Sequence, residues 1–351
     1  MMIDVIKVVV PSVLTFFLGV LITPFFTKFF YKYKMWKKSP RTEANITTDD
    51  FAKVHNTKGE LSTPRVGGVI IWVSVLLTIG VIYFLSIIFP TDLTEKLNFL
   101  SRNQTLVPLA AFILAALIGL ADDMLQIMGK SSYAKDSLIY RKIKIIAVTL
   151  IGLVISFWFY YKLEVSSIHM PFFGDINIGL WFIPFFVMVM LAVFSTSVID
   201  GVDGLSGGVM ATIFTAYALI AFVNNQIDIA AFCAVIAGGT LAFLWFNIPP
   251  ARFYMGETGI LGLTVTLSVI AFMTNSVMVL PIIALPLVLT SASVIIQMVS
   301  YKYFNKHRVF RVAPLHHHFE AIGWSKEKVV MRYWIVGVIF AIIGVIIALV
   351  S

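Results

Sequence analysis

The sequence predicts an all-α integral membrane protein that crosses the bilayer about ten times. Of its 351 residues, 59% are hydrophobic and 13% are charged, whereas a soluble domain is about 25% charged. The mean hydropathy is +0.94. A spanning helix needs about 20 apolar residues, and ten such runs can be placed along the chain. A soluble globular fold is therefore excluded, and a single transmembrane domain over residues 1–351 is expected.

The first apolar run, residues 8–30, is longer than the core of a secretory signal peptide, and only Lys7 precedes it as a basic residue. We expect it to be a retained first helix. The other nine spans follow from the same criterion of length and hydropathy. They are expected at residues 67–89, 105–121, 143–161, 178–196, 207–223, 229–246, 259–274, 277–299 and 333–350.

The basic residues predict how the chain is oriented in the membrane. Four segments contain 22 of the 26 Lys and Arg residues: 28–66, 122–144, 247–258 and 300–332. Cytoplasmic loops carry such an excess, so we expect these segments and the turn 197–206 on the cytoplasmic side, with both termini outside. The formal charge of +8 then reflects membrane topology and not a nucleic-acid partner.

Two local features complete the predicted architecture. In residues 164–180, the stretch MPFFGDINIGL places two apolar segments around a Gly-Asp turn, which predicts a small β-hairpin on the outer face. Cys233 is the only cysteine and lies inside an apolar run, so a disulfide framework and a cysteine-based metal cluster are both excluded.

Acidic residues gather at the predicted cytoplasmic boundary. Asp122 and Asp123 follow the third span, Asp200 and Asp203 follow the fifth, and Glu257 precedes the eighth. One such carboxylate can simply cap a helix, but five on one face, each beside glycines that let backbone approach a ligand, indicate a functional site. Carboxylate oxygens suit Mg²⁺, or alternatively Mn²⁺, shared with substrate phosphates. We therefore expect a phosphate-handling site.

A histidine triplet, His316, His317 and His318, lies in the last cytoplasmic loop. Three consecutive side chains cannot all face one metal ion, so phosphate hydrogen bonding or proton handling near neutral pH is favoured. Most basic residues of the same cytoplasmic loops are explained by their effect on membrane topology. Some could also neutralise part of a phosphate's charge, and the candidates are Lys58, Arg65, Lys130, Lys135, Arg252, Arg308 and Arg311.

In this order, the motifs resemble those of the polyprenyl-phosphate N-acetylhexosamine-1-phosphate transferases, over nearly the whole chain. The triple histidine and its flanks are similar to the phospho-N-acetylmuramoyl-pentapeptide transferase branch, because related GlcNAc-1-phosphate transferases usually carry a different histidine pattern. The matching motifs are STPRVGG (62–68), ADD (121–123), VIDGVDGL (198–205), FLWFNIPPA (243–251), FYMGETG (253–259) and QMVSYKYFNKHRVFRVAPLHHHFEAIGW (297–324).

The resemblance implies a ten-helix enzyme of the bacterial plasma membrane that acts as a homodimer with Mg²⁺. It would transfer phospho-MurNAc-pentapeptide from UDP-MurNAc-pentapeptide to undecaprenyl phosphate, giving lipid I and UMP for peptidoglycan synthesis. The alternative is a UDP-GlcNAc:polyprenyl-phosphate GlcNAc-1-phosphate transferase, favoured by TPRVGG. A secondary transporter is a remote alternative, since its acids would be expected near the bilayer midplane.

The resemblance also implies a role for each matching residue. Asp122 and Asp123 would lie at the catalytic end with the lipid phosphate, and Asp200 would be a catalytic acid that also contacts the metal. Glu257 would hold the metal ion. Substrate contacts would come from Lys58, Asp203, Asn247, His316, His317 and His318.

The sequence departs from the family pattern at four places. TPTMGG reads TPRVGG here, with an altered spacing from Lys58; Ser197 replaces an Asn, and Ile260 replaces a frequent Ser. Glu257 replaces the Asp of MGDTG, which keeps a carboxylate ligand but lengthens it by one methylene. These departures are compatible with a changed metal geometry or a changed sugar preference.

Overall fold

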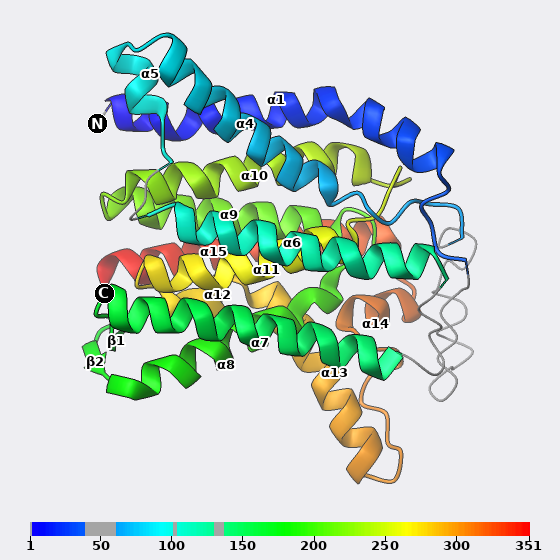
Figure 1. Cartoon of the computed structure of the whole chain (residues 1–351). Helices are drawn as coiled ribbons and strands as arrows, with labels where there is room; N and C mark the ends of the chain where they lie inside the picture. The colour runs from blue at the N-terminus through cyan, green and yellow to red at the C-terminus, as the bar shows by residue number, and fades with distance from the viewer. Residues whose placement is uncertain (1, 39–60, 101–103, 130–136) are drawn as a thin grey trace.

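The structure, a computed structural model, describes residues 2–38, 61–100, 104–129 and 137–351. Within them, ten helices are long and apolar enough to cross a membrane, which confirms the predicted fold class (Figure 1). These helices include α1 (Met2–Lys32), α4 (Val69–Ile88), α6 (Leu106–Ile127), α7 (Ser137–Lys162), α8 (Phe182–Ser195), α9 (Leu205–Val223), α10 (Ile227–Asn247), α11 (Gly256–Met273), α13 (Leu285–Tyr303) and α15 (Lys326–Val350).

Shorter elements connect or extend these helices. The 3-10 segments η1 (Gly179–Trp181) and η2 (Thr196–Ile199) flank α8 and lengthen the fifth span. The remaining short elements are α5 (Asp92–Leu97), η3 (Val277–Val279), α12 (Leu280–Ile283) and α14 (Leu315–Ala321).

Helices α9, α10 and α11 form the centre of the bundle. In their most apolar windows 72%, 83% and 89% of residues are buried, against 17% for α1 and 28% for α7 and α15. A helix that is apolar on all sides is either buried or faces lipid, and both cases occur here. Small residues allow close helix contacts: a Cβ added at Gly238 of α10 would lie 2.3 Å from the Ser12 carbonyl oxygen of α1.

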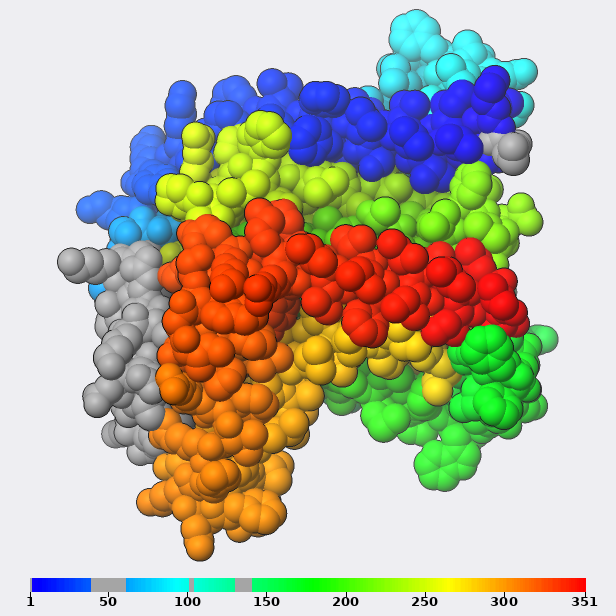
Figure 2. Space-filling model, turned by 180° about the vertical axis from the view of Figure 1, so that it is seen from behind, coloured from blue at the N-terminus to red at the C-terminus, as the bar shows by residue number. Residues whose placement is uncertain are grey.

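The two ends of the bundle differ. The termini, α5 and the hairpin of β1 (Ser167–Met170) and β2 (Gly174–Asn177) lie at one end, whereas α14 and the carboxyl end of α6 lie at the other (Figure 1). The strands are antiparallel, with Ile168 opposite Ile176, which confirms the predicted hairpin. Its turn was misplaced, because residues 171–173 form it and the Gly-Asp pair begins β2. At the other end, α13 and the segment that leads to α14 project from the body of the molecule (Figure 2).

Several predicted boundaries were wrong. Helix α6 continues to Ile127, so Asp122 and Asp123 lie inside the helix and not after it. The ninth span was expected as one helix over 277–299, but η3 and α12 precede α13, which begins at Leu285. Pro281 and Pro286 each lie at the start of a new helix, because proline lacks an N–H donor and disfavours helical geometry in the residue before it.

Helix starts also differ near the carboxyl end. The histidine triplet, expected in a loop, lies on α14. The last span begins at Lys326 and not at residue 333, because the Ser325 side chain accepts a hydrogen bond from the Lys328 backbone N–H at 3.3 Å and caps the helix.

Candidate active site

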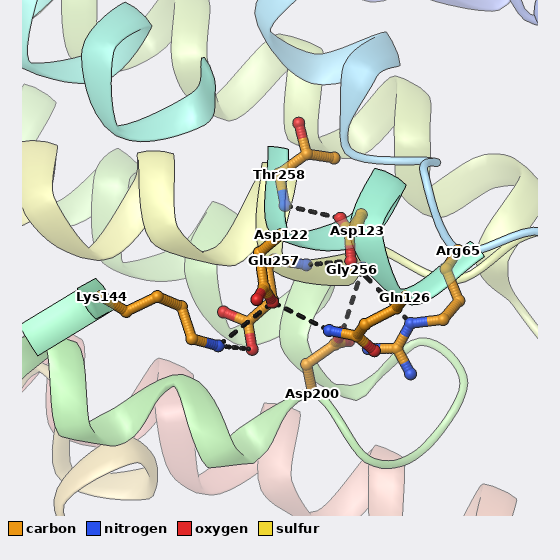
Figure 3. Close-up of polar contacts among 9 residues, drawn as sticks. All are labelled: Arg65, Asp122, Asp123, Gln126, Lys144, Asp200, Gly256, Glu257 and Thr258. Carbon is orange, nitrogen blue, oxygen red and sulfur yellow. Dashed lines mark hydrogen bonds and ion pairs between the residues drawn. The ribbon is translucent and has the colours of Figure 1, made fainter. Parts of the chain in front are cut away.

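Two carboxylates from other elements cap the amino end of α11. The oxygens of Asp123, on α6, accept hydrogen bonds from the backbone N–H groups of Glu257 at 3.2 Å and Thr258 at 2.9 Å. Asp200, which follows η2, accepts one from the Gly256 N–H at 3.2 Å. The first N–H groups of a helix have no partner within it, and the helix dipole favours anions there. Three distant segments are therefore fixed at one point (Figure 3).

A lysine of α7 joins the other two carboxylates of the site. Lys144 Nζ lies 2.8 Å from Glu257 Oε1 and 3.2 Å from Asp122 Oδ2. Gln126 Nε2, one turn further along α6, donates to the same Asp122 oxygen at 2.8 Å. Because opposite charges attract more strongly where water is partly excluded, the ammonium holds together two carboxylates that would otherwise repel each other (Figure 3).

Lys144 and Gln126 are site residues that the sequence motifs do not predict. A signal for Lys144 was present, since it lies among isoleucines within the spanning segment Arg141–Lys162, and an ionisable residue in a span is by default a functional candidate. In the sequence, Lys144 also belongs to the excess of basic residues that predicts the membrane topology. Gln126 carries no comparable signal, because its contact depends on the helical continuation of α6.

The glycines of the site serve contacts between backbone segments. Gly256 has a φ of +69°, and a Cβ there would lie 2.0 Å from the Arg65 carbonyl oxygen and 2.5 Å from Asp123 Oδ2. A Cβ at Gly119 would lie 2.2 Å from the Glu257 carbonyl oxygen. The glycines were expected to let backbone approach a ligand; in the structure they let the start of α11 approach the Arg65 segment and α6.

The loop that carries Asp200 packs against the histidines of α14. A Cβ at Gly201 would lie 2.6 Å from His316 Nε2 and 3.1 Å from His317 Nε2. His316 is fully buried, and burial holds its pKa well below the usual range, so the ring is neutral at pH 7. Burial also raises the pKa of Asp200, against the opposing effects of its hydrogen bond from Ser206 and of the Arg65 charge.

The other two histidines face different partners. His317 Nδ1 lies 3.2 Å from Glu320 Oε2, and His318 Nδ1 accepts a hydrogen bond from the Arg311 backbone N–H at 3.2 Å. Partial burial and the Arg311 charge lower the pKa of His318. The three rings thus have three separate environments.

Asn247 connects the Asp200 loop with the segment that precedes α11. Its Oδ1 accepts a hydrogen bond from the Gly204 N–H at 2.8 Å, and its Nδ2 donates to the Phe253 carbonyl oxygen at 2.8 Å. Asp203 Oδ2 in turn accepts from the Ala251 N–H at 3.4 Å, and burial raises the pKa of this carboxyl. Both ends of the Asn247 amide are used by backbone groups, so its role in this structure is to position the loops.

We expect the variant Asn247→Ala to unfold at a lower temperature and to lose activity. It leaves two buried backbone groups without partners, at a cost of about 1–3 kcal/mol each. Asn247→Asp keeps the acceptor for Gly204 but places a second oxygen 2.8 Å from the Phe253 carbonyl oxygen in a buried position, so it should also unfold at a lower temperature. Thermal unfolding in detergent measures the order of stability, and exposed Asn224→Ala is the matched control. Equal melting temperatures for all four proteins would contradict this role.

The residues fit a hard divalent cation such as Mg²⁺. Within the described residues, no group of three or more His, Cys, Asp or Glu could by itself hold a metal ion. However, Asp122 and Glu257 already share a cation, the Lys144 ammonium, and Mg²⁺ is usually bound by one or two carboxylates together with waters and substrate phosphates. The oxygen donors of this cluster match that chemistry.

The structure brings together Asp122, Asp123, Asp200 and Glu257, as the sequence suggested. Asp203 lies in the loop before α9, Asn247 is the last residue of α10, and the histidines lie on α14. Lys58, Lys130 and Lys135 fall outside the described residues.

The ten spanning helices and the carboxylate cluster at one end define a multi-pass membrane enzyme of the phosphoryl-transferring type. Residues 105–275 match glycosyl transferase family 4. The chain is 34% identical over 337 residues to the phospho-N-acetylmuramoyl-pentapeptide-transferase of Caldanaerobacter subterraneus subsp. tengcongensis, covering 95% of this chain and 96% of the relative.

Two further relatives have the same printed name. The protein from Geobacillus sp. (strain WCH70) is 34% identical over 342 residues, with 96% of both chains covered. The protein from Chloroflexus aggregans is 31% identical over 360 residues, covering 99% of this chain and 91% of the relative. The chain therefore belongs to the phospho-N-acetylmuramoyl-pentapeptide-transferase family, which confirms the resemblance found in its motifs.

Proposed function

We propose that this protein transfers phospho-MurNAc-pentapeptide from UDP-MurNAc-pentapeptide to undecaprenyl phosphate, giving lipid I and UMP for peptidoglycan synthesis in the bacterial plasma membrane. The observation that carries the proposal is the cluster at the end of α6: Asp122 and Glu257 share one cation, and Asp123 and Asp200 fix the helix that carries Glu257. Family membership supports this substrate class. A homodimer is part of the same proposal.

The proposed reaction is a direct displacement. An oxygen of the lipid phosphate attacks the β-phosphorus of the nucleotide, the new P–O bond forms, and the bond to the bridging oxygen breaks, so that UMP leaves with the electron pair. Phosphoryl transfer depends mainly on positioning and charge neutralisation. A two-step reaction through a phosphorylated aspartate is the alternative.

Each part of the cluster has a place in this reaction. Glu257, with help from Asp200, would hold Mg²⁺, which neutralises charge on the diphosphate and on the leaving phosphate. Asp122 holds the lipid phosphate or accepts its remaining proton; because a phosphate monoester has a second pKa near 6, little proton transfer is needed at neutral pH. Asp123 keeps the amino end of α11 in place. Substrate contacts are assigned to Lys58, Asp203, His316, His317 and His318, whereas Asn247, expected from the sequence to contact substrate, positions the loops through Gly204 and Phe253.

The test is release of UMP by the purified protein with undecaprenyl phosphate and Mg²⁺. UDP-MurNAc-pentapeptide and UDP-GlcNAc are compared as donors, and reactions with EDTA or without the lipid are the controls. We expect release from the pentapeptide donor only, and only when lipid and metal are both present. Release from UDP-GlcNAc alone would assign the protein to the GlcNAc-1-phosphate branch, and no UMP from either donor would overturn the proposal.

A further inference from the structure

Arg65 places a positive charge beside the carboxylates that cap α11. Its Nε lies 3.9 Å from Asp123 Oδ1, with the Arg65 side chain 11% exposed and that of Asp123 fully buried. Asp123 and Asp200 accept hydrogen bonds from the neighbouring N–H groups of Glu257 and Gly256, so both carboxylates lie at the same helix end as the Arg65–Asp123 pair. Arg65 belongs to the TPRVGG segment, one of the places where the sequence departs from the family pattern.

The backbone around Arg65 is fixed to the segment that begins α11. The Tyr254 N–H donates to the Pro64 carbonyl oxygen at 2.8 Å, and the Gly67 N–H donates to the Tyr254 carbonyl oxygen at 2.9 Å. The Gly68 N–H donates to the Met255 carbonyl oxygen at 2.9 Å. Since Met255 directly precedes α11, the position of Arg65 relative to the start of this helix is set by main-chain contacts.

The charges of the site divide into two groups. In the part of the chain that the structure describes, Lys144 pairs with Asp122 and Glu257, while Arg65 lies beside Asp123, which shares the amino end of α11 with Asp200. A helix amino end supplies about half a positive charge, which is less than two carboxylates need. Two buried carboxylates on one helix end would repel each other without a further cation.

We infer that Arg65 is a positioning residue: its guanidinium is the counter-charge that lets Asp123 and Asp200 together hold the amino end of α11, and thereby it fixes Glu257 opposite Lys144 and Asp122. Glu257 is the second residue of that helix, and its own backbone N–H is one of the capped groups. The kinetic consequences rest on the proposed function, whereas the structural consequence does not.

Hydrogen–deuterium exchange of the purified full-length protein tests the structural part. In Arg65→Met, the amides of Gly256, Glu257 and Thr258 should exchange about ten-fold faster or more, because their acceptors are no longer held. Arg65→Lys keeps the charge and should retain most of the protection. The matched control is Arg141→Met, which removes an exposed charge from α7 at the same end of the bundle and should leave these amides unchanged.

Unchanged exchange at 256–258 in Arg65→Met would overturn the inference, and so would equal loss in the Arg141→Met control. If Arg65→Met does not fold, Arg65→Gln, which keeps a polar side chain without the charge, replaces it in the same comparison. Faster exchange throughout α9 and α10 would indicate general destabilisation and would also count against a local positioning role.

The Mg²⁺ dependence of UMP release tests whether Glu257 is displaced. Arg65→Met should raise the Mg²⁺ concentration for half-maximal rate several-fold and lower kcat, while the KM for undecaprenyl phosphate stays the same. Mere loss of folded protein would lower the rate without moving the half-saturation point, and that result would overturn the inference. If the unchanged protein releases no UMP, the proposed function fails, but the exchange experiment still decides the role of Arg65.

Discussion

Glu257→Gln and Asp122→Asn are each expected to lower the rate of UMP release by about 10²–10³-fold, the usual scale for removing one electrostatic contact from an active site. Both substitutions preserve side-chain size. Each removes one of the two charges that share the Lys144 ammonium. Glu257→Gln would also leave the divalent cation with a neutral, weaker ligand, and Asp122→Asn would weaken the hold on the lipid phosphate.

The measurement is kcat with saturating UDP-MurNAc-pentapeptide and lipid, followed by a Mg²⁺ titration of each variant. Glu95→Gln and Asp92→Asn on α5 make the same chemical changes on exposed residues at the opposite end of the bundle, and they should retain full activity. A Glu257→Gln or Asp122→Asn enzyme within three-fold of the unchanged protein, roughly 0.7 kcal/mol in barrier height, would remove that residue from the proposed machinery.

Gly256→Ala is expected to abolish activity and to lower the melting temperature. The new Cβ would overlap the Arg65 carbonyl oxygen at 2.0 Å and Asp123 Oδ2 at 2.5 Å, and the φ of +69° costs a residue with a side chain about 1–2 kcal/mol. Because the first of these atoms is backbone, relief requires the start of α11 to move away from its capping carboxylates.

Gly80→Ala is the matched control for this substitution. Gly80 lies inside α4, and a Cβ there would have nothing within 4 Å, so the change should be neutral or stabilise the helix by about 0.5–1 kcal/mol. Thermal unfolding in detergent and UMP release measure both variants. If Gly256→Ala matched Gly80→Ala in stability and rate, the close packing of Arg65, Asp123 and the start of α11 would be refuted.

The spanning helices and the hairpin could be predicted from the sequence because their signals are local. A run of about 20 apolar residues specifies a membrane helix wherever it occurs, and two short apolar stretches on either side of a break indicate a hairpin, although its turn lies at 171–173 and not at the predicted Gly-Asp pair. The break in the ninth span also has a local signal, in Pro281 and Pro286. A single helix was expected there because the apolar run is continuous across both prolines.

The sequence predicted which carboxylates belong to the candidate site, but not what each of them contacts. Acidic residues at one membrane face were enough to identify Asp122, Asp123, Asp200 and Glu257 as neighbours. Their separate tasks were not visible, because each depends on a partner far along the chain: 135 positions separate Asp123 from Thr258 and 113 separate Lys144 from Glu257.

By itself, then, the sequence determined the number of spans, the family and the carboxylates of the site, since all of these follow from composition and short motifs; the orientation of the spans stays a prediction from the basic residues. Only the tertiary structure decided that Asp123 and Asp200 hold a helix end, that Lys144 occupies the place between Asp122 and Glu257, and that Gly256 must lack a side chain. The physical reason is that capping, charge pairing and close packing are contacts between segments, and their geometry exists only once the helices have packed against each other.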